Sequence, residues 1–223
     1  MHPHGGPEVL LGGSPGVAPA KVVILGGGVV GTQAAALAVG MRADVTILDI
    51  SPRRVRELEE LFGNSVRVLQ SDPATSLGQI AAADVVIGAV LVPGAAAPKL
   101  VCREDMARLK PDALLIDVAI DQGGCFETSR PTTYDDPTYE VDGIVHYRVA
   151  NMPGAVPCTS TRALTNATLP YVRRLAALAA DAALAADAAL AADAALAADP
   201  GLARGLNTRA GTLTNDAVAA AFA

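Results

Sequence analysis

The sequence predicts an α/β fold, a doubly wound parallel sheet followed by a C-terminal helical segment. Between residues 21 and 150, short and mostly β-branched apolar runs alternate with longer segments of helical pattern. Strands of a parallel sheet are buried on both faces, so they need such continuous apolar runs. Alternation at this spacing implies right-handed β-α-β units. The last part of the chain is dominated by alanine, leucine and aspartate, and its alanine and leucine favour helix.

Six short apolar runs are the predicted strands: KVVIL (21–25), DVTILD (44–49), VRVLQ (66–70), DVVIGAV (84–90), ALLIDVA (113–119) and IVHYRVA (144–150). The predicted helices between them are 29–40, 51–62 and 73–82. Ser51 and Asp72 are expected to cap the second and third helices, because a proline follows each at the first helical position.

The C-terminal part is expected to start with a connection or a short helix over 151–171, which is rich in Pro, Thr and Asn. Residues 172–198 repeat ALAADA and predict a long helix. The six-residue period spreads the leucines over three faces, which disfavours a coiled coil, and the recurring aspartates disfavour a membrane span. Two more short helices are expected, one starting at Asp199-Pro200 and one over NDAVAAAFA (215–223).

Composition limits the class of protein. The 223-residue chain is 51% apolar but only 3% aromatic, so Val, Ile, Leu and Ala must fill its core. A net charge of −6 argues against nucleic-acid binding. Cys102, Cys125 and Cys158 are widely spaced, which favours a reducing, cytoplasmic location over disulfides or a bound metal. The N-terminus lacks the cationic start and apolar run of a signal peptide.

A glycine-rich turn follows the first predicted strand. Gly26, Gly28 and Gly31 fit G-x-G-x-x-G, in which the glycines allow a tight turn, close approach of a pyrophosphate and close packing of the helix. Alone the pattern can be a simple loop. Asp49 ends the second strand, where a carboxylate accepts hydrogen bonds from ribose hydroxyls, and this context predicts a Rossmann-type dinucleotide site. Asp49 favours NAD over NADP, a preference that neighbouring arginines weaken slightly.

Two later loops leave the ends of predicted strands, where this fold binds its cofactor. Val90 and Leu91 either pack against the cofactor or belong to a loop that crosses the sheet edge. Asp121 is either a turn cap or an acid that faces the reacting ring. Arg130 either holds a phosphate or pairs with Glu127.

Six segments together resemble bacterial alanine dehydrogenase: GGGVVGTQAA, VTILD, DVVIGAVLVPGAAAPKLV, LLIDVAIDQGGCFETSRPTTYDDPTY, VANMPGAVPCTSTRALTNATLPY and LARGLN. The resemblance runs from about residue 6 to the C-terminus, with the Ala/Asp repeat as its main departure. It implies an NAD-dependent oxidoreductase that converts L-alanine reversibly to pyruvate and ammonium, and a homo-oligomer. The proton-translocating transhydrogenases are related and share the cofactor fold.

The resemblance also implies functional residues. Asp121 matches the catalytic aspartate of the family. The positions that match its NAD contacts are Gly28, Val29, Asp49, Arg54, Ser71, Val90, Leu91, Val118, Ala119, Ile120, Asp121, Arg130, Val149, Ala150, Asn151 and Met152.

The family's substrate-binding arginine and lysine and its catalytic histidine lie in an N-terminal domain, whereas Met1 here matches the linker after that domain. The expected organisation is therefore a remnant linker (1–20), an NAD-binding domain (21–150) and a C-terminal helical remainder of the substrate domain (151–223). We expect this chain to be catalytically impaired. The alternatives are a non-catalytic NAD-binding module, or a cofactor half that another polypeptide completes.

Overall fold

The structure is a computed structural model that describes residues 5–92, 96–184, 196 and 198–221. It divides into two compact units, Met1–Asn151 and Met152–Ala223. The division falls one residue after the domain boundary expected at 150/151.

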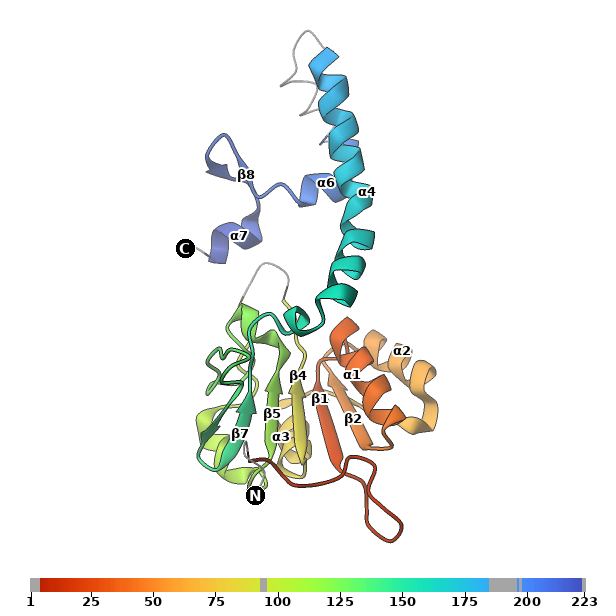
Figure 1. The fold of residues 1–223 in the computed structure, drawn as a ribbon, viewed down its shortest axis with the longest axis vertical. Helices are drawn as coiled ribbons and strands as arrows, with labels where there is room; N and C mark the ends of the chain where they lie inside the picture. Colours follow the sequence, from red (N-terminus) through yellow and green to blue (C-terminus); the bar gives the residue numbers. More distant parts are fainter. Residues whose placement is uncertain (1–4, 93–95, 185–195, 197, 222–223) are drawn as a thin grey trace. The chain divides into compact units, whose positions relative to one another are not determined.

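The first unit contains a seven-stranded sheet in the order β3-β2-β1-β4-β5-β7-β6 (Figure 1). The strands are β1 (Lys21–Leu25), β2 (Asp44–Asp49), β3 (Arg67–Gln70), β4 (Val85–Gly88), β5 (Leu114–Asp117), β6 (Thr138–Val141) and β7 (Ile144–Tyr147). All neighbouring pairs are parallel except β6 with β7. The order turns back at β1, since β2 and β3 extend to one side and β4 and β5 to the other. The predicted doubly wound α/β fold is therefore confirmed.

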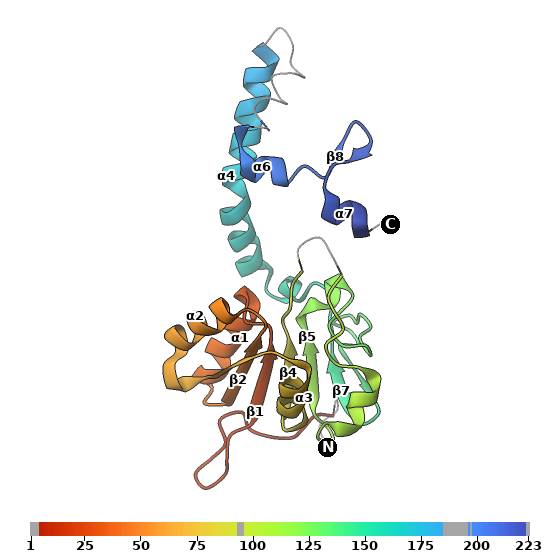
Figure 2. The same ribbon diagram turned by 180° about the vertical axis from the view of Figure 1, so that it is seen from behind.

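Helices cover both faces of this sheet. The helices α1 (Val29–Gly40) and α2 (Pro52–Phe62) lie on one face, where Ile47 and Leu58 belong to the same buried cluster. The helix α3 (Pro73–Ala81) lies on the other face, where Ile80 packs in a cluster with Leu115 (Figures 1 and 2). This double cover explains why the strands are apolar throughout.

The predicted caps of α2 and α3 are confirmed. The Ser51 hydroxyl accepts the Arg54 backbone N–H at 3.3 Å, and Asp72 Oδ1 accepts the Thr75 backbone N–H at 2.9 Å. Both side chains satisfy amides that have no partner inside the helix.

Three strand predictions extend too far. The run 84–90 ends as a strand at Gly88. The run 113–119 leaves the strand conformation after Asp117, and Val118–Gln122 form the 3-10 helix η3. The turn follows from a side chain, because Asp117 Oδ1 accepts the Ala119 N–H at 3.1 Å. The run 144–150 likewise ends as a strand at Tyr147.

The edge strand β6 was not predicted. It forms a hairpin with β7 through Asp142-Gly143, and both residues have positive φ, 53° and 77°. This is the conformation of a two-residue hairpin turn, for which Asp-Gly is a strong sequence signal.

The β6–β7 hairpin carries a buried histidine. In His146, Nδ1 lies 2.8 Å from the Ile144 carbonyl and Nε2 lies 2.8 Å from the Thr128 hydroxyl. The ring also stacks on Tyr139, with 4.9 Å between centroids. Burial, followed by the positive charge of Arg148, lowers the pKa of His146 from 6.5 to about 4.

This pKa predicts a loss of stability in mild acid. As pH falls below about 6.5, the unfolded chain binds a proton that native His146 does not bind, so stability falls toward pH 4. At pH 5 the contribution is about 2 kcal/mol. Urea unfolding at pH 7 and pH 5 measures it, with His146→Gln as the control that lacks the titrating ring. Equal pH dependence of the two proteins would contradict the prediction.

The second unit is mainly helical. Its elements are η4 (Met152–Ala155), α4 (Pro157–Leu184), α6 (Pro200–Arg204), β8 (Thr208–Arg209), β9 (Thr212–Leu213) and α7 (Asp216–Ala221). Of the two alternatives expected over 151–171, a connection or a short helix, the structure has helix from Pro157 onward, but as part of the long helix α4, which includes Pro170. The predicted repeat helix is seen as far as Leu184, and 185–195 and 197 lie outside the described residues.

The ends of this unit follow the prediction more closely. Asp199 caps α6 by accepting the Gly201 and Leu202 backbone N–H groups. The helix α7 also lies where one was expected, whereas the β8–β9 hairpin was not foreseen. Within the described ranges, none of the helices has the length and apolar character that crossing a membrane requires.

Candidate functional site

The three motif glycines of the turn between β1 and α1 differ in the space that surrounds them. Gly26 has φ +97°, and a Cβ there would lie 2.8 Å from the Ala89 carbonyl oxygen. A Cβ on Gly31 would overlap the backbone oxygen of Gly26. At Gly28, in contrast, no atom lies within 4 Å of the Cβ position. The turn is therefore closed against the sheet and open above Gly28, as the motif predicts.

Asp49 links the end of β2 to this turn. Its Oδ2 accepts the Gly27 N–H at 2.8 Å, and its Oδ1 accepts the Ser51 N–H at 2.9 Å. An ionised carboxylate has about four acceptor sites, so each oxygen can still accept from a ligand.

Arg54 holds the same turn from α2. Its Nε donates to the Gly27 carbonyl at 2.7 Å, Nη2 donates to the Thr32 hydroxyl at 2.9 Å, and Nη1 lies 2.8 Å from Glu57 Oε2. Each nitrogen of the guanidinium thus has a protein partner. Arg54 is placed beside the turn and outside the lining of the cavity described next, which differs from the direct cofactor contact that the resemblance implies.

A cavity of about 570 Å³ lies at the carboxyl ends of β1, β2, β4 and β5. This is the end of a doubly wound sheet where ligands bind, at the point where the strand order reverses. Its volume is typical of a small-molecule site. The predicted residues that line it are Gly26, Gly28, Val29, Asp49, Ser71, Val90, Leu91, Val118, Ala119 and Asp121.

Several other residues of this lining were not predicted from the sequence. Ile50 and Gln122 are examples, and each directly follows a predicted acidic residue. Ile50 directly follows β2, and this position is a signal that could have identified it. Gln122 ends the short helix η3 and could have been identified only as the neighbour of Asp121. Leu100 gave no such signal, because it comes from the long connection after β4.

Asp121 is exposed at the cavity, within the short helix η3. Its Oδ1 accepts the Asn151 backbone N–H at 3.2 Å. Asn151 has φ +53°, and its carbonyl accepts the Tyr134 hydroxyl at 3.2 Å. Asp121 and Asn151 are therefore hydrogen-bonded to each other, and the resemblance implies that both contact the cofactor.

The other predicted residues lie elsewhere in the structure. Ile120 and Val149 are buried, and Ala150 is exposed outside the lining. Met152 is the first residue of the second unit.

The structure does not pair Arg130 with Glu127, which was one of the two alternatives offered from the sequence. Its guanidinium stacks on the Tyr139 ring at 4.0 Å from the centroid, and its backbone N–H donates to the Tyr139 hydroxyl. Glu127 accepts instead the Arg103 backbone N–H at 2.7 Å.

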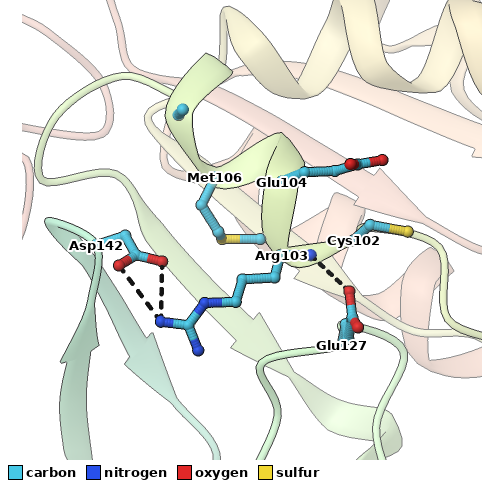
Figure 3. Close-up of a pocket in the computed structure, with 7 residues that line it drawn as sticks. Cys102, Arg103, Glu104, Met106, Glu127 and Asp142 are labelled. Carbon is cyan, nitrogen blue, oxygen red and sulfur yellow. Dashed lines mark hydrogen bonds and ion pairs between the residues drawn. The ribbon is translucent and has the colours of Figure 1, made fainter.

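A second hollow, of about 720 Å³, lies around Cys102, Arg103, Glu127 and Asp142 (Figure 3). Arg103 is 3.4 Å from a carboxylate oxygen of Asp142. Partial desolvation, followed by the charges of nearby carboxylates, raises the pKa of the Cys102 thiol, which disfavours the nucleophilic thiolate.

Among the described residues, no group of three or more His, Cys, Asp or Glu is arranged to hold a metal ion. The cavity at the glycine turn is therefore the stronger candidate.

Comparison with known proteins identifies the family of the chain. Residues 1–216 match the family model "Alanine dehydrogenase/PNT, C-terminal domain". The chain belongs to this family. Among alanine dehydrogenases, it is 52% identical to that of Halomonas elongata over 98% of this chain and 56% of the relative. It is 50% identical to alanine dehydrogenase 2 of Staphylococcus aureus over the same shares.

The fold of the chain also resembles solved structures of alanine dehydrogenase and transhydrogenase. An L-alanine dehydrogenase superposes with a TM-score of 0.83 at 51% identity, over 98% of this chain and 57% of that one. A transhydrogenase from Sinorhizobium meliloti superposes with a TM-score of 0.57 at 30% identity, over 65% of this chain and 41% of that one. The chain thus spans somewhat more than half the length of its alanine dehydrogenase relatives.

Proposed function

We propose that the chain binds NAD in the cavity at the glycine turn and takes part in the NAD-linked oxidative deamination of L-alanine. The observation that carries this proposal is the meeting of Gly28, Asp49 and Asp121 at one cavity of about 570 Å³. Relatives at 50–52% identity are alanine dehydrogenases, which supports the choice of substrate.

The residues present fit the dinucleotide. The first turn of α1 begins beside Gly28, and its backbone N–H groups have no carbonyl partner inside the helix, so they suit a pyrophosphate. Asp49 suits the ribose hydroxyls and repels a 2′-phosphate, which favours NAD over NADP. Arg54 does not offset this repulsion, because its guanidinium already binds the turn and Glu57.

Bound NAD would supply the acceptor for the hydride on Cα of L-alanine. The iminium that remains adds water and releases pyruvate and ammonium. The role of Asp121 is to hold the proton that water or the amine gives up, since its carboxylate is exposed at the cavity.

The chain's own side chains supply mainly the cofactor side of this reaction. Within the part of the chain that the structure describes, the cavity lining includes no lysine, arginine or histidine. The substrate carboxylate needs a cation to orient it. We therefore propose that this chain turns over L-alanine slowly, since poor orientation of the substrate alone can cost about 100-fold.

An assay with L-alanine and NAD tests the proposal. We expect slow NADH formation above the protein-free background, and we expect Asp121→Asn to lower it about 100-fold while NADH affinity changes less than about twofold. Asp135→Asn, in an exposed loop, is the matched control and should retain the rate. Saturable NADH binding with no turnover would favour the alternative, a non-catalytic NAD-binding module.

A further inference from the structure

We infer that the loop 118–126 is held in shape by two opposite charges, the Asp117 carboxylate and the Lys99 ammonium. We further infer that Lys99 is a positioning residue for the nicotinamide half of the dinucleotide. The second inference rests on the proposed function. The first concerns the free protein and stands independently of it.

The carboxylate binds the amide groups of the loop. Asp117 accepts the Ala119 N–H at 3.1 Å and the Cys125 N–H at 2.9 Å, so it contacts both ends of the loop. It also accepts the Ser129 hydroxyl at 2.5 Å and forms an ion pair of 3.0 Å with Arg148. The Asp117 and Arg148 side chains are both fully buried, which fixes the carboxylate in place.

The ammonium binds the carbonyl groups of the same loop. Lys99 Nζ lies 2.6 Å from the Gly123 oxygen, 2.8 Å from the Gly124 oxygen and 3.4 Å from the Phe126 oxygen. Gly123 and Gly124 have φ of +87° and +76°, a left-handed conformation that other residues adopt only with strain. This tight turn brings successive carbonyls to one cation, and hydrogen bonds to a charged donor are stronger than neutral ones.

The segment that carries Lys99 is fixed to the loop on both sides of it. The Ala97 N–H donates to the Gln122 carbonyl at 2.9 Å, and the Leu100 N–H donates to the Cys125 carbonyl at 2.7 Å. The backbone on both sides of Lys99 is therefore hydrogen-bonded to the loop, and this places the ammonium at the turn.

The loop faces one end of the cavity. Val118, Asp121 and Gln122 line it from the end of β5, whereas Asp49 lines it from the end of β2. Two strands, β1 and β4, separate these edges in the sheet. A dinucleotide with its adenosine ribose at Asp49 places its nicotinamide at the loop. Lys99 itself is outside the lining, although Pro98 and Leu100 line the cavity, so we infer that its ammonium acts on the ligand through the loop.

The test compares NADH with ADP-ribose, which lacks the nicotinamide. We expect Lys99→Met to weaken NADH binding about tenfold and to change ADP-ribose binding less than about twofold. Lys99→Arg should recover most of the NADH affinity, because a guanidinium also donates to several carbonyls. Lys110→Met is the matched control, since that ammonium lies 2.6 Å from Asp84, near the start of β4 and away from the loop.

Each outcome decides the inference. Unchanged NADH binding in Lys99→Met, or equal weakening of both ligands, would overturn the role of Lys99. Failure of the unaltered chain to bind either ligand would instead refute the proposed function. Amide hydrogen exchange without ligand then tests the clamp, which predicts about tenfold faster exchange at residues 119–125 in Lys99→Met and unchanged exchange in β1. Equal exchange in the loop would refute the clamp itself.

Discussion

Gly31→Ala is expected to destabilise the protein by about 1–3 kcal/mol and to weaken NADH binding about tenfold or more. A Cβ at this position would overlap the Gly26 carbonyl oxygen, which is backbone and cannot rotate away. Either α1 must move from the sheet or the turn must change shape. Both movements displace the amides at the start of α1 from the cavity. Urea unfolding and NADH titration measure the two effects.

Gly78→Ala provides the matched control. Gly78 lies inside α3, and no atom is within 4 Å of its Cβ position. The same substitution should therefore stabilise the protein by about 0.5–1 kcal/mol, as alanine favours helix. NADH binding should not change. A Gly31→Ala variant as stable as the unaltered chain would show that the turn is not closely packed on α1.

Asp117→Asn is expected to destabilise the protein by about 3–5 kcal/mol, because it leaves a buried guanidinium without its carboxylate. In Arg148, Nε and Nη2 are already buried with no hydrogen-bond partner among the described residues, although the guanidinium also stacks at 4.8 Å from the Phe126 ring. Urea unfolding at pH 7 measures the loss.

Substitution of the other partner of the ion pair, Arg148→Met, should destabilise the protein less than Asp117→Asn does, by about 1 kcal/mol or more. Asp117 retains three donors in that variant, the backbone N–H groups of Ala119 and Cys125 and the hydroxyl of Ser129. A larger loss of stability in Arg148→Met than in Asp117→Asn would contradict this. It would show that Asp117 acts mainly through the ion pair and not through its hydrogen bonds to the loop amides.

The sequence predicted the parts of the fold that depend on local patterns. The apolar runs identify β1 to β5 and β7, and Ser51 and Asp72 cap the helices at which the sequence places them. The glycine spacing likewise predicted which positions exclude a Cβ. These features depend on short-range sterics and on burial, both of which leave a signature within a few residues.

Other features depend on partners that are distant in the sequence. Arg54 binds the Gly27 carbonyl, 27 residues earlier, so its role beside the turn could not be read from its neighbours. The ammonium of Lys99 meets the Gly124 oxygen 25 residues later. The β6–β7 hairpin was missed although its Asp142-Gly143 turn carries a recognisable local signal.

Calorimetric titration of the 223-residue chain with NADH and with NADPH tests the central claim most directly. We expect saturable binding of one NADH per chain, with NADPH binding at least about tenfold weaker because Asp49 repels the 2′-phosphate. No binding of NADH, or equal affinity for the two, would contradict it.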